Sequence, residues 1–276
     1  MKKQADYIKR IEIKGLWGRK NITWNLRPDV NILSGVNGIG KSTILNDSVR
    51  SLKALEGASK ADKGMPAVSV SFIFSPEDAG EIPFDVIRSF DRPLLSTALL
   101  EKIGNQQVRT ELDWQLYQLQ RRYLDYQVNI GNRIIELLTS GDAAGQAEAS
   151  KVSLPKTRFQ DLIDELFSET GKKIIRKHNE LLFEQDGDTL TPYQLSSGEK
   201  QMLVILTTVL VEDFRHCALF MDEPEVSLHV EWQQRLISLI RELNPHAQII
   251  LTTHSPALIM NGWMDAVTEV SDITTT

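Results

Sequence analysis

The first part of the chain alternates between apolar and polar positions in a way that predicts several strands and one helix. Residues 8–14 and 22–26 alternate with the period of two that is typical of strands, and glycines lie between them. A short apolar run at residues 31–33 leads into a glycine-rich loop. Apolar residues then recur with a helical period over residues 43–55. We expect two adjacent strands, a buried strand, a loop and a helix, in that order.

Two further strands are expected at residues 68–74 and 84–90, and then the pattern changes. Between residues 112 and 138 apolar side chains recur at spacings of three and four, which is the period of a long amphipathic or coiled helix. A Gly, Ala and Ser-rich link at residues 140–150 precedes a second helical pattern over residues 159–175. The two helices are expected to form a projecting hairpin.

The last third of the chain returns to short alternating elements. Asp186-Gly187-Asp188 lies between two apolar segments and predicts a hairpin turn. Helices are expected at residues 201–211 and 231–243, with buried strands at 218–221 and 248–252. Alternation of this kind indicates an α/β fold with a mainly parallel sheet.

The amino-acid composition of the chain is ordinary and does not indicate a particular fold. The 276 residues are 41% hydrophobic and 25% charged, as in ordinary globular proteins. Cys217 is the single cysteine, which excludes an intrachain disulfide and fits a reducing cytoplasm. No apolar run approaches the ~20 residues that span a bilayer. The net charge of −6 disfavours a surface that is basic everywhere and leaves a local basic stripe open.

The glycine-rich loop has the residues of a phosphate-binding loop. Residues 35–43 match the Walker A pattern G-x-x-x-x-G-K-[ST] in full, between a strand and a helix. Its backbone N–H groups would surround the β-phosphate at the positive end of the helix, and Lys41 would add a charge on the β- and γ-phosphates. Ser42 would bind Mg²⁺. The predicted ATP-binding positions here are Gly35, Asn37, Gly38, Ile39, Gly40, Lys41, Ser42 and Thr43.

A second motif supplies two acids at the end of a buried strand. Residues 218–221 are apolar and are followed by Asp222 and Glu223, as in a Walker B motif. Asp222 would hold Mg²⁺, and Glu223 would polarise the attacking water.

Two more segments give the chain a family resemblance. Residues 195–201 read Leu-Ser-Ser-Gly-Glu-Lys-Gln and resemble the ABC ATPase signature, and the segment around His254 resembles the switch-histidine segment of that superfamily. The resemblance implies an ABC ATPase core with N-terminal antiparallel strands and an inserted helical hairpin. We expect the nucleotide domain at residues 1–93 and 181–276, and the insertion at residues 94–180.

The resemblance also implies how the site works. Ser196, Gly198 and Glu199 would contact ATP that is bound to a second copy, so that two ATP molecules lie between two head-to-tail chains. His254 would reach the γ-phosphate and, with Glu223, serve catalysis.

After the acids the chain reads Pro-Glu-Val-Ser-Leu-His, which resembles the OLD and RecF-like ATPases rather than transporter subunits. Compact members are similar to the ATPase subunit of PARIS-type anti-phage systems. That resemblance implies a cytoplasmic ATPase switch that controls a separate effector chain, such as a Toprim-type nuclease. Because only 22 residues follow His254 in this sequence, we expect a Toprim-type nuclease on a separate chain.

Several alternatives stay open. A RecF or SMC-like DNA-repair ATPase is the second interpretation, and a transporter subunit is the third. Asp91 stands near the place of the usual Q-loop glutamine, and Trp17 or the Arg19-Lys20 pair could stack on adenine. A basic cluster, predicted near the end of the second inserted helix, would touch nucleic acid or an acidic partner, or form a solvated helix face. Its members are Lys172, Lys173, Arg176, Lys177 and His178.

Overall fold

A parallel sheet of five strands forms the centre of the computed structural model, which describes residues 2–55, 68–89, 93, 107–140 and 144–275. In spatial order its strands are β11 (Val267–Glu269), β3 (Val30–Ser34), β10 (Ala247–Thr252), β9 (Cys217–Asp222) and β5 (Phe84–Arg88). Because these strands are parallel, their carboxyl ends meet at one edge.

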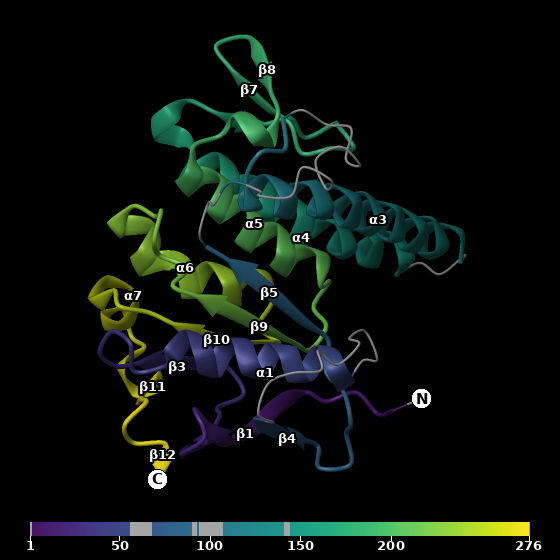
Figure 1. Ribbon diagram of the computed structural model, residues 1–276. Helices are drawn as coiled ribbons and strands as arrows, with labels where there is room; N and C mark the ends of the chain where they lie inside the picture. Colours follow the sequence, from purple (N-terminus) through teal and green to yellow (C-terminus); the bar gives the residue numbers. More distant parts are fainter. Residues whose placement is uncertain (1, 56–67, 90–92, 94–106, 141–143, 276) are drawn as a thin grey trace.

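A second sheet is antiparallel and contains the N-terminal strands. Its order is β12 (Thr274–Thr275), β2 (Lys20–Asn25), β1 (Tyr7–Leu16) and β4 (Ser69–Ser75). Helix α1 (Lys41–Leu55) lies between this sheet and the parallel one (Figure 1). The sequence prediction of a mainly parallel sheet with N-terminal antiparallel strands is confirmed.

The parallel sheet buries both faces at its centre, which explains why β9 and β10 are mostly apolar. Phe220 and Ile250 pack into the core that contains α1 and the antiparallel sheet. Leu219 and Leu251 pack into the opposite core, beneath α5 (Ser197–Val211) and α6 (Val230–Leu243). A short helix, α7 (Pro256–Met260), follows β10, and the 3₁₀ turns are Ser168–Thr170, Pro192–Gln194 and Met264–Ala266. None of the described helices combines the length and apolarity needed to cross a bilayer.

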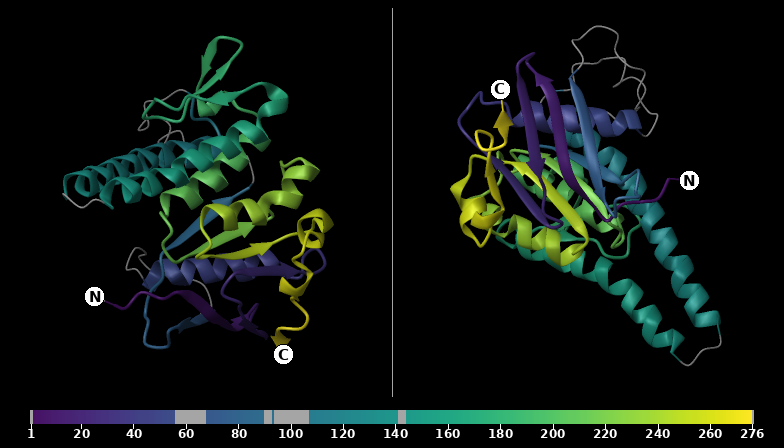
Figure 2. Two further views of the ribbon diagram at one scale, coloured as in Figure 1. Left: turned by 180° about the vertical axis from the view of Figure 1, so that it is seen from behind. Right: turned by 90° about the horizontal axis from the view of Figure 1, so that it is seen from below.

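The inserted helices form the expected hairpin, α3 (Glu111–Thr139) and α4 (Gly145–Leu166). Tyr123 and Phe159 pack between them with ring centroids 6.2 Å apart. The base of α3 also packs on α5, whereas the far end of the hairpin projects from the sheets (Figure 2).

Two sequence predictions about the insertion are wrong. The second helix ends at Leu166 and does not include Ile174, because the chain turns at Gly171 (φ 69°) and enters β6 (Lys173–Ile174). This strand pairs with β7 (Phe183–Gln185), which in turn pairs with β8 (Asp188–Leu190). The small sheet therefore crosses the expected domain boundary at residue 181.

The second wrong prediction concerns the start of this helix. Helix α4 begins at Gly145, inside the segment of residues 140–150 that was expected to be a link.

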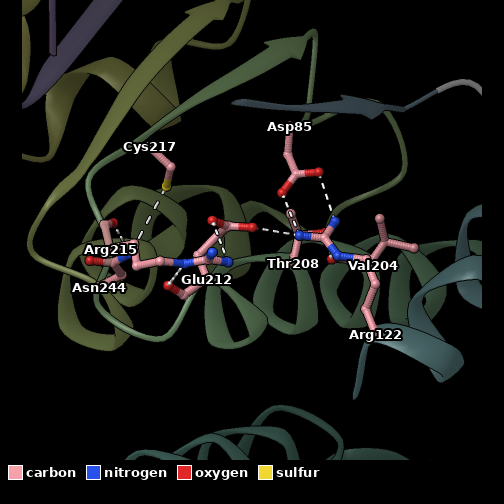
Figure 3. A network of polar contacts seen from close by, with 8 residues as sticks. All are labelled: Asp85, Arg122, Val204, Thr208, Glu212, Arg215, Cys217 and Asn244. Carbon is pink, nitrogen blue, oxygen red and sulfur yellow. Dashed lines mark hydrogen bonds and ion pairs between the residues drawn. The ribbon is translucent and has the colours of Figure 1, made fainter. Parts of the chain in front are cut away.

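An arginine on α3 ties the insertion to the sheet. Arg122 donates from Nη1 and Nη2 to the two carboxylate oxygens of Asp85 on β5, at 2.7 and 2.9 Å, and from Nη2 to Glu212 Oε1 at 2.5 Å (Figure 3). The Glu212 side chain is 6% exposed, and it also accepts from Arg215. Burial raises the pKa of Glu212, and nearby Asp85 adds to this, whereas Arg122 opposes it.

We therefore expect Arg122→Met to lower the free energy of unfolding by about 2 kcal/mol, because two carboxylates lose their shared cation in a partly buried place. Urea unfolding measures this. Arg133→Met is the matched control on the same helix, since its pair with Asp213 is more exposed and worth less than about 1 kcal/mol. Equal effects of the two variants would contradict the role given to Arg122.

Candidate ATP site

The phosphate-binding loop joins the end of β3 to the start of α1 and has the backbone that its glycines permit. Gly38 and Gly40 have φ of 78° and 113°, a region that other residues rarely adopt. A β-carbon on Gly40 would lie 2.4 Å from the ring of Trp17. The Lys41 ammonium donates to the carbonyl oxygens of Gly35 at 2.9 Å and Val36 at 3.4 Å, so it is held within the loop.

The loop opens into a cleft of about 670 Å³, here called the phosphate cleft. Of the residues predicted to bind ATP or to catalyse, the cleft brings together most of the loop with Glu223 and His254, although these two follow different strands. Gly35 and Ile39 belong to the loop but do not line the cleft. Ile39 packs against the core that contains α1. The lining residues are Trp17, Asn37, Gly38, Gly40, Lys41, Ser42, Thr43, Glu223 and His254.

Asp222 lies directly beside the loop. Its Oδ1 accepts hydrogen bonds from Ser42 Oγ at 2.9 Å and from Thr252 Oγ1 at 2.5 Å. The last residues of β9 and β10 are thus linked to the first turn of α1. Ser42 and Asp222 together present hard oxygen donors, which is the ligand type that Mg²⁺ prefers. The residues therefore fit the predicted metal.

Glu223 and His254 face each other at the cleft wall, with 3.7 Å between Glu223 Oε1 and His254 Nε2. Glu223 has a φ of 48°, in the left-handed region, and its N–H donates to both the carbonyl and the hydroxyl oxygen of Thr252 at 3.1 Å. A non-glycine residue keeps this strained backbone conformation only where the surrounding contacts hold it in place. Glu223 directly follows β9 and lines the phosphate cleft together with the loop.

Glu225 holds the histidine segment in place, a role that the sequence analysis missed. The side chain is buried, and its Oε1 accepts from Thr253 Oγ1 at 2.6 Å and from the backbone N–H of His254 at 2.9 Å. Thr252 was missed as well. Glu225 follows the Walker B acids and Thr252 precedes the switch histidine. Their closeness in sequence to Asp222 and His254 was the signal that could have identified them.

The signature residues lie at the start of α5, outside the lining of the phosphate cleft. Ser196 caps this helix and is exposed, and its N–H and Oγ each donate to Glu199 Oε2 at 2.9 Å. A β-carbon on Gly198 would lie 2.6 Å from the carbonyl oxygen of Ser227, so only glycine allows this approach. The start of α5 thus packs on the segment that follows the Walker B acids.

The Glu199 side chain is held by partners within the chain. Its side chain is 3% exposed, and its Oε1 accepts from Lys172 Nζ at 2.9 Å and from Thr170 Oγ1 at 2.8 Å. These partners lie within the chain, and the predicted contact between Glu199 and a nucleotide on a second copy stays a prediction. Burial alone would raise the pKa of Glu199, but the hydrogen bonds from Ser196, Lys172 and Thr170 outweigh it and lower the pKa.

Asp91, the residue expected near the place of the Q-loop glutamine, lies outside the described residues. A glutamine from α3 instead contacts the end of β5: Gln115 accepts from the N–H of Arg88 at 3.2 Å and donates to its carbonyl at 3.0 Å. Arg88 is the parallel neighbour of Asp222 in the sheet. Asp113, also on α3, pairs with Lys200 of α5 at 2.8 Å.

Comparison with known proteins gives the family. Residues 62–261, more than half of the chain, match the family model described as "AAA domain, putative AbiEii toxin, Type IV TA system". The chain belongs to this AAA family. The matched span includes the signature, the Walker B acids and His254, and the phosphate loop lies before it.

Individual relatives agree with this assignment. The chain is 24% identical to Septu protein PtuA of Bacillus thuringiensis over 91% of its own length and 72% of that protein. It is also 24% identical to the retron Vc95 probable ATPase of Vibrio cholerae serotype O1 biovar El Tor, over 54% of this chain and 32% of that one. This chain is an ATPase, and it binds nucleotide. It has an ABC-type core and belongs to the OLD/RecF-like group of ATPases.

A solved structure supports the fold. An SMC head bound to the C-winged helix domain of ScpA superposes with a TM-score of 0.54 at 15% identity, covering 92% of this chain and 91% of that one. At this identity the likeness concerns the fold alone.

Trp17 borders the cleft on the side of the loop, with its ring on Gly40 and Lys20 Nζ 5.3 Å from the ring centroid. If the ring stacks on adenine, Trp17→Ala should weaken ATP binding by about 3- to 10-fold, the value of an aromatic stack. Trp17→Phe should retain most of the affinity. Titration with a fluorescent ATP analogue measures both, and an unchanged Kd in Trp17→Ala would exclude the stacking role.

The capping role of Glu199 predicts a pH dependence. Because its folded-state pKa is depressed below the ordinary value of 4.5, its stabilisation is present above that value and is lost as the pH falls through the folded-state pKa. Glu199→Gln should cost about 1–2 kcal/mol at pH 7 and progressively less in acid. Urea unfolding at several pH values tests this, and a constant difference between the two proteins would contradict it.

Proposed function

We propose that this ATPase is the switch subunit of a bacterial anti-phage defence complex, in which ATP joins two copies of the chain and its hydrolysis separates them. The observation that carries the proposal is the placement of the motifs. Lys41, Glu223 and His254 line one cleft, whereas the start of α5 with Ser196 and Gly198 lies outside it.

The exposed signature serine supports a site that a second copy completes. A capped helix N-terminus presents N–H groups and a positive dipole end, which favour a bound anion. The side chain of Glu199 uses its own oxygens on the cap and on Lys172, so it offers no charge that would repel a phosphate at the surface. In the proposed dimer Ser196 and Gly198 contact the γ-phosphate bound by the other chain.

Ser42 and Asp222 are the proposed Mg²⁺ ligands. When bound, Mg²⁺ would neutralise charge on the β- and γ-phosphate oxygens. The hydroxyl of Thr252 holds the Asp222 carboxylate in position for this role.

Glu223 is the proposed general base, and His254 is proposed to contact the γ-phosphate. The carboxylate of Glu223 would accept a proton from the attacking water, a role that usually contributes 10²–10⁴-fold to the rate. Its backbone is fixed by Thr252 and its side chain faces His254, so the pair is held in one arrangement across from the loop.

The defence role and the separate effector come from resemblance. The motif sequence resembles the ATPase subunits of PARIS-type systems, in which a different chain is the nuclease effector. The similarity to Septu protein PtuA over most of both chains and to a retron ATPase supports the same assignment.

The basic cluster gives little support to the alternative of a DNA-binding ATPase. Two of its five basic residues are used inside the chain, Lys172 on Glu199 and Arg176 on Asp161 and Asp164. The cluster also lies on and on either side of β6, so the prediction that it occupies the end of an inserted helix is wrong.

Glu223→Gln should bind ATP with near wild-type affinity, release phosphate at least about 100-fold more slowly, and gain particle mass when ATP and Mg²⁺ are added. A phosphate-release assay and light scattering measure these effects. Lys41→Ala is the control, which should show neither turnover nor the gain in mass. Unchanged phosphate release in Glu223→Gln would remove Glu223 as the base, and no ATP-dependent gain in mass would contradict the switch.

A further inference from the structure

Helix α3 has a second row of apolar positions that the core does not use. Its buried residues, among them Leu116, Tyr123 and Ile130, pack within the chain. The second row follows a 3-4-3-4-3 spacing along a different side of the helix, which keeps one line of the helix facing a single partner helix. This row, here called the outer seam, consists of Arg121, Leu124, Val128, Gly131, Ile135 and Leu138.

The outer seam is exposed along the projecting part of the hairpin. The residues are 41% exposed at Leu124, 54% at Val128, 60% at Ile135 and 56% at Leu138. Single exposed apolar residues are ordinary, but four of them on one heptad line make a continuous strip of the kind that marks an interaction site. The far end of the hairpin stands clear of both large sheets, so another helix has access to it (Figure 2).

We propose that the outer seam binds the outer seam of a second copy of this chain, with the two α3 helices antiparallel. In that arrangement Leu124 lies opposite Ile135 of the other copy, and Val128 lies opposite Gly131. Apart from the neighbouring backbone of α3 itself, no atom of the described residues lies within 4 Å of the position of a β-carbon on Gly131, so the glycine leaves a hole for the valine of the partner helix.

The polar residues of the seam favour this orientation and this occupant. In a parallel, in-register pair Arg121 would face Arg121, and Gly131 would face Gly131, which combines charge repulsion with a void. The antiparallel pair places Arg121 opposite Leu138, near the helix end, where its charged group can reach water. The positions that flank the seam are mostly uncharged, so two identical copies do not repel: Gln118, Gln120, Asp125, Gln127 and Asn132.

This contact is independent of nucleotide and separate from the proposed ATP-joined dimer. The seam lies on the inserted hairpin, whereas the phosphate cleft lies at the edge of the parallel sheet. Two different self-contacts on one chain would link copies into assemblies larger than a dimer.

Cross-linking in the absence of ATP and Mg²⁺ tests the orientation. Leu124→Cys and Ile135→Cys in one chain lie about 16 Å apart along the helix, too far for an intrachain disulfide. Under mild oxidation this double variant should form a covalent dimer, whereas each single variant should not. The natural cysteine, Cys217, is buried and gives a clean background. Efficient cross-linking of Leu124→Cys alone, or none in the double variant, would overturn the proposal.

Particle mass tests the contact itself. Nucleotide-free wild type and Leu154→Ser should have twice the mass of Val128→Glu by light scattering. Leu154 is the matched control because it is a 60% exposed residue of the same hairpin, on α4. A monomeric wild type, or a dimeric Val128→Glu, would contradict the proposal. Phosphate release measured on the same samples reports on the ATP site separately, so failure of the seam and failure of the switch remain distinguishable.

Discussion

The carboxylate of Asp222 is the junction on which the site depends. A single oxygen accepts hydrogen bonds from Ser42 on α1 and Thr252 on β10, and Asp222 itself ends β9. Three chain segments that are far apart in sequence are therefore held at one point. The parallel sheet makes this possible, because β3, β9 and β10 all end at the same edge. Glu223 and His254 follow directly from that edge and need only short segments to reach the phosphate loop.

The signature end of α5 is held by a second set of contacts, and these come from the insertion. Lys172 pairs with Glu199, and Asp113 pairs with Lys200, both at largely buried positions. On the other side of α3, Gln115 holds the backbone of Arg88 beside Asp222. The base of the hairpin thus touches both the strand end next to Asp222, the proposed Mg²⁺ ligand, and the helix that carries the signature. In the proposed dimer, the orientation of the signature towards the second chain would depend on how the hairpin is seated.

The parts of this structure that could be predicted were those encoded locally. The glycine loop, the two acids after an apolar run, and the spacing of α3 each signal their structure within a few residues or turns. The end of α4 could not be read in this way, since Ile174 continues an apolar period but pairs with Phe183 in a sheet. Glu199 stands at a variable position of the signature, and its carboxylate is used by Lys172 and Thr170, a contact that only the folded chain reveals. Long-range partners such as Gln115 and Arg88 left no local signal.

In the proposed dimer, one chain supplies the phosphate loop and another supplies the signature to each ATP. Mixing two inactive variants tests it directly. Lys41→Ala disables the loop and Ser196→Arg blocks the signature, so each protein alone should release phosphate at only a small fraction of the wild-type rate. In an equal mixture, mixed dimers contain one intact pair of Lys41 and Ser196 contributed by different chains, and about a quarter of the wild-type activity per chain should return. A mixture no more active than its separate components would contradict the shared site.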